Sequence, residues 1–385
     1  MNPVTQVPPR PAHVESASID HPALTTDTAR ILSHWMKTGS ILTFHRWLLV
    51  IGGLIAASVV VLVVCLEFGA TPVEIRTLVG AILTLLQGEH INADGLGTPG
   101  VIMIQIRLPR VLMGFLVGAS LAGIGVTLQA LLRNPLADPY VLGVSSGAAL
   151  GVSLAMLLGI GTGFALLPTL TLFGFLGGLL SLVLIYRLAQ SQGRLPVHSL
   201  LLAGVILNAI LTALIMFITT IMDPNRSAGL MAWLMGSLTA PTYPALGVFV
   251  LYVVVVLAIL MHKAQMLNVM TLGEDIARSL GIETEWVKKQ LFVLTALLTG
   301  AVVSVSGMIG FVGMVIPHVV RMLVGSDHRL LFPASALVGG MFLVVSDTIA
   351  RTLLAPSEIP VGIVTALAGG PFFLYLLLCR KDRMN

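Results

Sequence analysis

Apolar segments of membrane-spanning length recur along this chain from residue 47 onwards, and they restrict its fold more than any other feature. A helix of roughly 20 apolar residues crosses the hydrocarbon core of a bilayer, because that core is about 30 Å thick. The sequence therefore predicts an all-α polytopic membrane protein with ten transmembrane helices. The segments are 47–66, 107–130, 140–160, 165–187, 199–221, 245–262, 288–306, 311–324, 331–350 and 360–379.

Composition supports a membrane protein rather than a soluble one. Only 10% of the 385 residues are charged, 56% are hydrophobic, and the mean hydropathy is +0.99. Soluble domains carry about 25% charged residues. The pI of about 9.3 and the net charge of +4 also occur in nucleic-acid-binding proteins, but in a membrane protein basic residues mark cytoplasmic loops. We therefore expect contact with membrane lipid and none with nucleic acid.

The distribution of lysine and arginine predicts the orientation in the membrane. With ten alternating segments, 16 of the 21 basic residues lie on the side of the N-terminus and 5 on the opposite side. Loops rich in basic residues stay in the cytoplasm, so both termini are predicted to be cytoplasmic. Residues 1–46 are polar and contain several prolines. They are predicted to form a flexible cytoplasmic tail, or a tail with an interfacial helix at 27–45, ahead of a transmembrane domain at 47–385.

The acidic residues argue against transport driven by protons or sodium. None of the 17 aspartates and glutamates falls in the middle of a predicted segment, whereas ion-coupled carriers usually place ionisable groups there. The chain also lacks GxxxxGK[ST], the loop that cradles nucleotide phosphates. If the protein pumps, its energy is expected to come from another subunit. An ion-coupled carrier remains the first alternative.

A membrane enzyme is the second alternative, and the absence of catalytic motifs disfavours it. The sequence has no HExxH, no paired carboxylates in mid-membrane and no nucleophile motif, so no catalytic residue is assigned. Pro317 and His318, with Arg321 at the next turn, resemble part of a metal site. A metal ion needs several ligands at suitable spacing, and none accompanies His318. We interpret these residues as a kink and a membrane anchor, and we predict no metal site.

The connection between the sixth and seventh segments contains a short amphipathic helix. The whole connection reads QMLNVMTLGEDIARSLGIETEWVKK, from Gln265 to Lys289, and the helix is predicted between Asp275 and Ile282 within it. Glu274 and Asp275 suit the N-terminus of a helix, and Gly281 suits the position just after its end. Such a helix either covers the bundle or docks a cytoplasmic partner, and the residues alone favour neither.

Small residues are frequent between Ile106 and Gly151, where two arginines precede a long apolar run. Glycine, alanine and serine let transmembrane helices approach closely, and they also suit the wall of a pathway for a large rigid cargo. We expect close helix packing at Gly118, Ser120, Ala122, Gly123, Gly125, Gly143, Ser145, Ser146 and Gly147.

Several motifs occur in one order along the chain: RLPR, NPLADPYVLGVSSGAALG, LLLAG, LGEDIARSLGI, GFVGMVIPHVVR, GSDHR and IPVGIVTALAGGPFF. Together they resemble the type II ABC importer permeases of the iron-chelate and vitamin B12 uptake family, over about residues 47–380. The resemblance implies a vitamin B12 importer permease-like bundle in the bacterial inner (plasma) membrane. It implies a homodimer with the pathway at its interface, two cytoplasmic ATPase subunits and a periplasmic substrate-binding protein. It implies no cofactor on this chain, with ATP and magnesium on the partner ATPase subunit.

The resemblance also assigns roles to particular residues. Arg107, Arg110 and Arg351 correspond to the outer arginines that meet glutamates of the binding protein. From the residues alone, Arg107 and Arg110 can instead anchor a helix end at lipid headgroups, and Arg351 can pair with Asp347 one turn earlier. The segment LGEDIARSLGI resembles the coupling helix that sits in the ATPase cleft, which favours docking of a partner over a helix that only covers the bundle. Its assigned residues are Gly273, Glu274, Asp275, Ile276, Ala277, Arg278, Leu280 and Gly281.

Two cytoplasmic gate regions are also implied, one at Asn134 and Leu136 and the other at Val197 and His198. Vitamin B12 permeases carry small hydroxyl residues at the second pair. This chain has Val197 and His198 there instead, and the difference leaves the gate chemistry and the cargo open. A histidine there suggests heme ligation, although a loop histidine without that role is the more common case. The predicted function is a permease subunit, not an enzyme, of an ATP-binding cassette importer. It would move an iron chelate (siderophore or heme) or cobalamin from the periplasmic binding protein to the cytoplasm.

Overall fold

The computed structural model describes residues 42–69, 99–160 and 169–381. Within these ranges the regular structure is helical, apart from one isolated bridge between Ser191 and Arg194. The all-α class predicted from the apolar segments is confirmed. Most of the predicted N-terminal tail, including most of the alternative helix at 27–45, lies outside the described residues. The first described helix, α2, begins at Phe44.

Ten apolar helices in the described ranges coincide with the ten predicted segments. Seven of them are long and apolar enough to cross a membrane, and three are shorter. The long helices are α2 (Phe44–Glu67), α5 (Leu108–Leu131, after a π-helical stretch at Ile102–Arg107), α7 (Thr169–Ala189), α8 (Val197–Ile221), α10 (Tyr243–His262), α13 (Thr284–Ser306) and α15 (His328–Thr352). The shorter ones are α6 (Val144–Leu157), α14 (Val312–Val324) and the apolar part of α16 (Val361–Lys381).

Helix α6 begins later than its predicted segment. A 3-10 helix at Pro139–Leu142 precedes it, and the Oδ1 atom of Asp138 caps this helix by accepting the N–H of Tyr140 at 2.9 Å. Gly143 then adopts a φ of +77°, a left-handed conformation that glycine reaches without steric cost. The chain therefore changes direction at Gly143, and α6 starts only after this turn.

Three short helices lie in the connections: α9 (Pro224–Leu234), α11 (Ala264–Thr271) and α12 (Glu274–Ser279). Of these, only α12 was predicted, and α9 and α11 are absent from our prediction. The N-cap of α9 is Asp223, whose Oδ1 atom accepts the N–H of Asn225 at 2.8 Å, and Pro224 occupies its first turn. An Asp-Pro pair is a strong start signal for a helix, so the sequence did contain evidence for α9.

Helix α5 is the core of the bundle. Residues 117–132 are all buried, and α5 contacts α15, α14, α13 and α10. A side chain at Gly125 would overlap the carbonyl oxygen of Gly313 on α14, and one at Gly118 would overlap that of Gly339 on α15. The predicted close packing through small residues is therefore confirmed for α5, where backbones meet directly.

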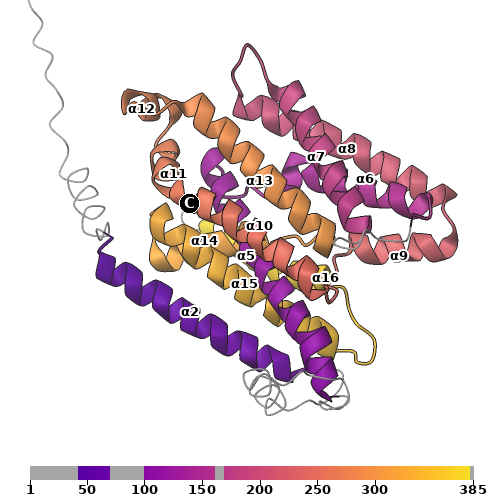
Figure 1. Ribbon diagram of the computed structural model, residues 1–385. Coiled ribbons are helices and arrows are strands. Elements are labelled where there is room, and N and C mark those ends of the chain that lie inside the picture. The colour runs from indigo at the N-terminus through magenta and orange to yellow at the C-terminus, as the bar shows by residue number, and fades with distance from the viewer. Residues whose placement is uncertain (1–41, 70–98, 161–168, 382–385) are drawn as a thin grey trace, which may run out of the picture. The chain divides into compact units, whose positions relative to one another are not determined.

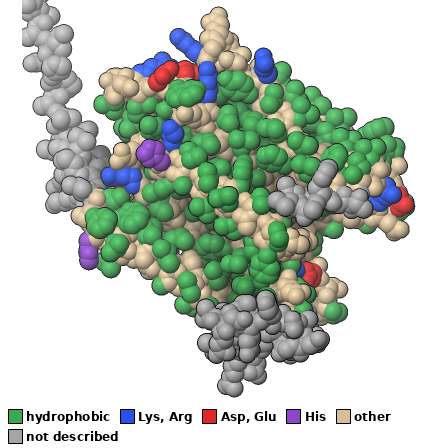
Figure 2. All heavy atoms as spheres, viewed as in Figure 1, with side chains coloured by type: hydrophobic (Ala, Val, Ile, Leu, Met, Phe, Trp, Pro, Cys, Tyr) green, Lys and Arg blue, Asp and Glu red, His purple; other side chains and the backbone are tan. Residues whose placement is uncertain are grey.

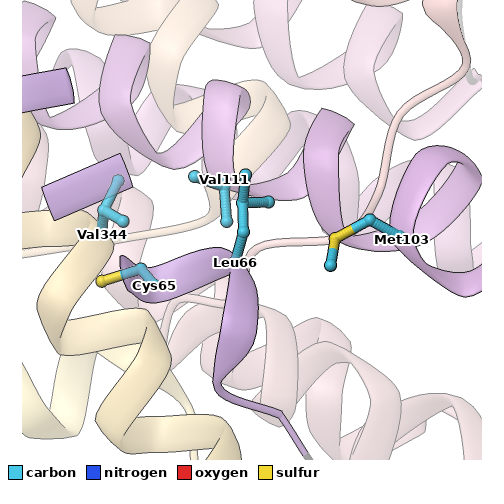
Figure 3. Packing of buried hydrophobic residues seen from close by; sticks show 5 residues of the cluster. All are labelled: Cys65, Leu66, Met103, Val111 and Val344. Atoms are coloured by element: carbon cyan, nitrogen blue, oxygen red, sulfur yellow. The ribbon is translucent and has the colours of Figure 1, made fainter. Parts of the chain in front are cut away.

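The other helices flank α5 and α13 in two groups (Figure 1). Helices α6, α7 and α8 pack against one another, and α7 also packs against α13. Helices α2 and α14 pack against α15 and α5 instead. The end of α2 is fixed by a buried apolar cluster (Figure 3), which consists of Cys65, Leu66, Met103, Val111 and Val344.

The outer surface of the bundle suits a lipid environment. Apolar side chains cover much of the face shown in Figure 2, and lysine, arginine and acidic side chains gather towards its edges. Helix α8, for example, exposes a long row of large apolar residues. They are Leu202, Val205, Ile206, Ile210, Leu214, Met216, Phe217 and Ile221. A helix satisfies its own backbone polar groups, so such a surface is stable against hydrocarbon.

Candidate functional site

Helix α12 has the boundaries that its glycines predict. Gly273 precedes it with a φ of +120°, and Gly281 follows it with a φ of +80°. The N–H of Gly281 donates to the carbonyl oxygen of Arg278 at 2.9 Å, and that of Ile282 donates to Ala277 at 3.0 Å. These two bonds form a Schellman motif, which closes the helix. The result is a short helix with fixed ends between α11 and α13.

The apolar residues of α12 point in two directions. Ala277 is fully buried against the bundle, whereas Ile276 is 48% exposed and Leu280 is 63% exposed. Ile276 and Leu280 are therefore available for contact with a partner. Of the three apolar residues Ile276, Ala277 and Leu280, only Ala277 is buried within this chain.

Charged side chains hold α12 to the start of α13. The Nζ atom of Lys288 lies 2.7 Å from Oε1 of Glu285 and 3.0 Å from Oε2 of Glu274. Arg278 pairs with the same Glu274 oxygen at 3.3 Å, and its Nε donates to Oγ1 of Thr284 at 3.1 Å. The Lys288 side chain is only 3% exposed. Its buried charge is therefore compensated by two carboxylates, one from each helix.

The second predicted gate, Val197 and His198, forms the first turn of α8, and the side chain of His198 is exposed. Pro196 precedes this turn with extended backbone, and Leu195 precedes Pro196. The N–H of Leu195 donates to Oε2 of Glu285 at 2.8 Å. One carboxylate therefore contacts both the segment leading into the gate and the cations beside α12.

The first predicted gate lies in the turn after α5. The Oδ1 atom of Asn134 accepts the N–H of Leu136 at 3.0 Å, and the Leu136 side chain is exposed. Burial raises the pKa of Asp138, which caps the following 3-10 helix, to about 6. That 3-10 helix packs against α8, the helix that begins with the second gate.

A cavity of about 570 Å³ lies beside the first gate. Its wall includes Arg133 and Asn134 from the turn after α5, Thr271 and Leu272 from the segment leading into α12, and Arg321 from α14. The first predicted gate and the approach to α12 therefore share one cavity at the same end of the bundle.

The three predicted docking arginines lie close to the start of α5 and the end of α15, and they point largely into the protein. Arg107 is only 4% exposed, and its Nη1 atom donates to the carbonyl oxygens of Leu66 and Glu67, each at 3.0 Å. A buried guanidinium that binds the last carbonyls of α2 fixes a helix end.

Asp347 joins the other two arginines. Its Oδ2 atom lies 2.9 Å from Nε of Arg351, and its Oδ1 atom lies 3.0 Å from Nη2 of Arg110. The pairing of Arg351 with Asp347, which the sequence left open, is therefore present. Arg110 also pairs at 3.0 Å with Glu358, whose side chain is 54% exposed. The Arg110–Glu358 pair is the part of this cluster that reaches the surface.

The arginine cluster and the gates lie at opposite ends of α5. Arg107 and Arg110 flank its first residue, and Asn134 follows its last turn. Helix α5 has 24 residues and is therefore about 36 Å long. That length exceeds the hydrocarbon core of a bilayer, which is about 30 Å thick. The two ends of α5 are therefore far enough apart to reach opposite sides of a membrane.

Comparison with known proteins agrees with this arrangement. Residues 59–379 match the FecCD transport family, a range that contains every candidate site residue described above. The chain belongs to the FecCD transport family. The resemblance to the type II importer permeases of the iron-chelate and vitamin B12 uptake family is thereby confirmed.

Three similar proteins extend the comparison. The chain is 42% identical over 289 residues to the hemin transport system permease protein HmuU of Yersinia pestis, covering 74% of this chain and 85% of that protein. It is 40% identical over 319 residues to the cobalamin import system permease protein BtuC of Halobacterium salinarum, covering 82% and 83%. The structure of a metal-chelate type ABC transporter in an inward-facing conformation matches with a TM-score of 0.72 and 32% identity, over 86% of this chain and 99% of that one.

This FecCD chain is therefore a multi-pass permease of the bacterial inner membrane that works within an ATP-binding cassette transporter. It is a transport protein rather than an enzyme, and ATP hydrolysis belongs to a separate ATPase subunit. Helix α14 continues through Pro317, next to His318. Among the described residues, no three His, Cys, Asp or Glu side chains lie close enough together to hold a metal ion.

Sequence reasoning missed two residues of this FecCD chain that the structure places between the sites, Glu285 and Lys288. Their spacing of three on a helix is a usable signal for an ion pair. The contact of Glu285 with Leu195 gave no such signal, because the two residues are 90 positions apart.

Proposed function

We propose that this chain is the permease subunit of an importer for an iron chelate, either a siderophore or heme, or for cobalamin. The names of its hemin and cobalamin relatives support these cargo classes. The observation that carries the proposal is the placement of two different kinds of site at the two ends of α5. An arginine cluster lies at one end, and two gates with a short helix that exposes Ile276 and Leu280 lie at the other.

The proposed orientation places α12, the two gates and both termini in the cytoplasm. The excess of lysine and arginine on that side supports this orientation, because basic loops remain in the cytoplasm. The arginine cluster with Glu358 would then face the periplasm. A cytoplasmic α12 is also what a partner that hydrolyses cytoplasmic ATP requires.

Two ATPase subunits are the proposed cytoplasmic partners, each receiving one α12, and ATP and magnesium would bind on them rather than on this chain. The exposed side chains of Ile276 and Leu280 supply apolar contact area for a cleft. The ion pairs of α12 with Lys288 attach the helix to α13, so that a push on α12 reaches the bundle.

A second copy of the chain is the proposed partner in the membrane, with the pathway between the copies. Leu136 and His198, which lie in the two predicted gates, are exposed in the single chain and are available to close a pathway from both sides. For His198 we propose a role in the gate, and heme ligation is the second possibility to be tested.

A periplasmic binding protein is the proposed donor of the cargo. Arg107, Arg110 and Arg351 form its proposed docking cluster, in which Arg110 is the member paired with an exposed acid, Glu358. An acidic lobe can compete with Glu358 for Arg110 at the surface. Arg107 and Arg351 are buried, so they would contribute by fixing the structure under the docking surface and by adding positive charge near it.

Reconstitution tests the cargo assignment. The permease is placed in proteoliposomes with its ATPase subunits and its binding protein, and the accumulation of heme, a ferric siderophore and cobalamin is measured with and without ATP. We expect ATP-dependent accumulation of one of these classes. Hydrolysis that accelerates on addition of the loaded binding protein while none of the three accumulates would contradict the cargo assignment.

The variant His198→Ala separates the two roles of the histidine. If His198 is a gate residue, the variant should leak whichever cargo is carried to a different extent. If His198 binds heme, the variant should lose a heme absorbance change and should selectively lose heme uptake. Ser199→Ala is the matched control, because it alters the next residue of the same turn.

A further inference from the structure

The carboxylate of Glu285 divides its two oxygens between different parts of the molecule. Its Oε1 atom lies 2.7 Å from Nζ of Lys288 and 3.7 Å from Nη2 of Arg278, the basic residue of α12. Its Oε2 atom accepts the N–H of Leu195 at 2.8 Å. A single side chain therefore connects the proposed coupling helix, α13 and the turn between α7 and α8.

The attachment to α12 is electrostatic, and Lys288 at its centre is shielded from water. The ammonium of Lys288 is buried and contacts both Glu285 and Glu274, so withdrawal of either carboxylate removes half of the ion pairing of a buried charge. Arg278 lies within ion-pairing distance of both glutamates. Lys288, which is 3% exposed, holds the two glutamates together most strongly, while the half-exposed Arg278 adds a weaker, more solvated pair to each.

The attachment to the second gate is the hydrogen bond from the N–H of Leu195 to Glu285, at a conformationally restricted part of the backbone. Leu195 is buried, and the next residue, Pro196, has no N–H and a restricted φ. The carbonyl oxygen of Pro196 accepts the N–H of Leu200 at 3.0 Å, which locks this point to the first turn of α8. A displacement of Leu195 is therefore transmitted directly to Val197 and His198.

Glu285 is not needed to cap its own helix. The N-cap of α13 is Glu283, which makes no side-chain capping bond. The two carboxylates are close in sequence, at the start of the same helix, yet only Glu285 reaches another segment. Its position is explained by the connection that it makes.

We propose that Glu285 is the positioning residue that transmits movement of α12 to the second gate. This inference rests on the proposed function, since it takes α12 as the ATPase-driven element and Val197 with His198 as a gate. When α12 shifts, the shared cations carry Glu285 with it, and Glu285 pulls or releases the backbone at Leu195. The gate at the start of α8 then opens or closes in step with the ATPase.

The test uses the full complex in proteoliposomes and three variants. Glu285→Ala removes both connections. Glu285→Gln keeps an oxygen that can accept the N–H of Leu195 but removes the charge. Glu283→Ala is the matched control, a nearby glutamate whose side chain is exposed. Spin labels at Arg194→Cys, an exposed position one residue before Leu195, report the distance between the gate segments of the two copies.

Loss of a hydrogen bond to a charged group shifts an equilibrium by roughly tenfold or more. For Glu285→Ala we therefore expect ATPase association and hydrolysis close to the parental values, with cargo imported per ATP reduced by roughly tenfold. The label distance should no longer respond to nucleotide. Glu285→Gln should recover part of both readouts, and Glu283→Ala should match the parent.

Two results would overturn the inference. One is parental import per ATP with a normal nucleotide response in Glu285→Ala. The other is loss of ATPase association in the same variant, which would make Glu285 only a support for α12. The parental complex is measured first. If it neither binds an ATPase nor imports cargo, the proposed function fails, and this inference fails with it.

Discussion

The Nη2 atom of Arg110 on α5 lies 3.0 Å from Oδ1 of Asp347 on α15, and this ion pair joins two helices at one end of the bundle. The Asp347 side chain is only 3% exposed, and its second oxygen binds Arg351. The pair therefore has a structural role in addition to its proposed place in a docking surface. This double role has consequences that can be measured.

The variant Asp347→Asn should destabilise the protein strongly. Removing one partner of a buried ion pair costs about 3–5 kcal/mol, because the remaining charge has no compensation, and here two arginines lose their shared acid. Thermal unfolding in detergent measures the effect. Glu358→Gln is the control, since it removes the exposed partner of the same Arg110 and should cost only about 0–1 kcal/mol. Equal melting temperatures for the two variants would contradict the structural role of Asp347.

Glu358→Gln and Arg110→Gln should change the affinity for the periplasmic binding protein in opposite directions. Because Glu358 competes for Arg110, Glu358→Gln should tighten the binding of an acidic lobe, and Arg110→Gln should weaken it. Binding of the periplasmic protein is measured at low and high salt, because exposed charge pairs are screened. Identical affinities for the two variants at low salt would remove Arg110 from the docking surface.

The exposed position of Leu280 makes the coupling helix testable without unfolding the chain. Leu280→Ala should leave the melting temperature unchanged, because this leucine is largely outside the packed core. It should weaken ATPase association, measured by co-purification or by titration in nanodiscs. Leu353→Ala is matched in type and exposure, lies directly after α15 near the arginine cluster, and should not affect ATPase association. A strong loss of stability in Leu280→Ala would place the residue in the bundle instead.

Topology supplies an independent prediction. The basic residues predict that both termini are cytoplasmic. Reporter fusions at residues 1 and 385 should therefore both give cytoplasmic activity. A periplasmic signal at either terminus would reverse the assignment of α12 and the gates to the cytoplasm.

Periodicity and spacing predicted the parts of the structure that depend on local sequence. The apolar segments located ten helices, and Gly281 marked the end of α12, because a left-handed residue there closes the helix. The start of α6 was misplaced because Gly143 turns the chain after a 3-10 helix. Such features leave local signals in the sequence. Asp223, which caps the start of α9, is one that could have predicted that helix.

The contacts between distant segments could not be predicted in this way. From the sequence, Arg107 at the start of RLPR resembles a surface arginine, yet it is buried against the end of α2. The link from Glu285 to Leu195 depends on how α13 packs beside the α7–α8 turn. Such pairings arise from tertiary packing, and one sequence carries no periodic trace of them.

The proposed function requires that ATP hydrolysis drives uptake, and one measurement tests this source of energy directly. Uptake of cargo into proteoliposomes is compared under two conditions. In the first, ATP, the ATPase subunits and the binding protein are present. In the second, a proton or sodium gradient is imposed without ATPase subunits. Since none of the acidic residues lies in the middle of a predicted segment, we expect accumulation only in the first condition. Accumulation driven by an ion gradient in the absence of the ATPase would contradict the account.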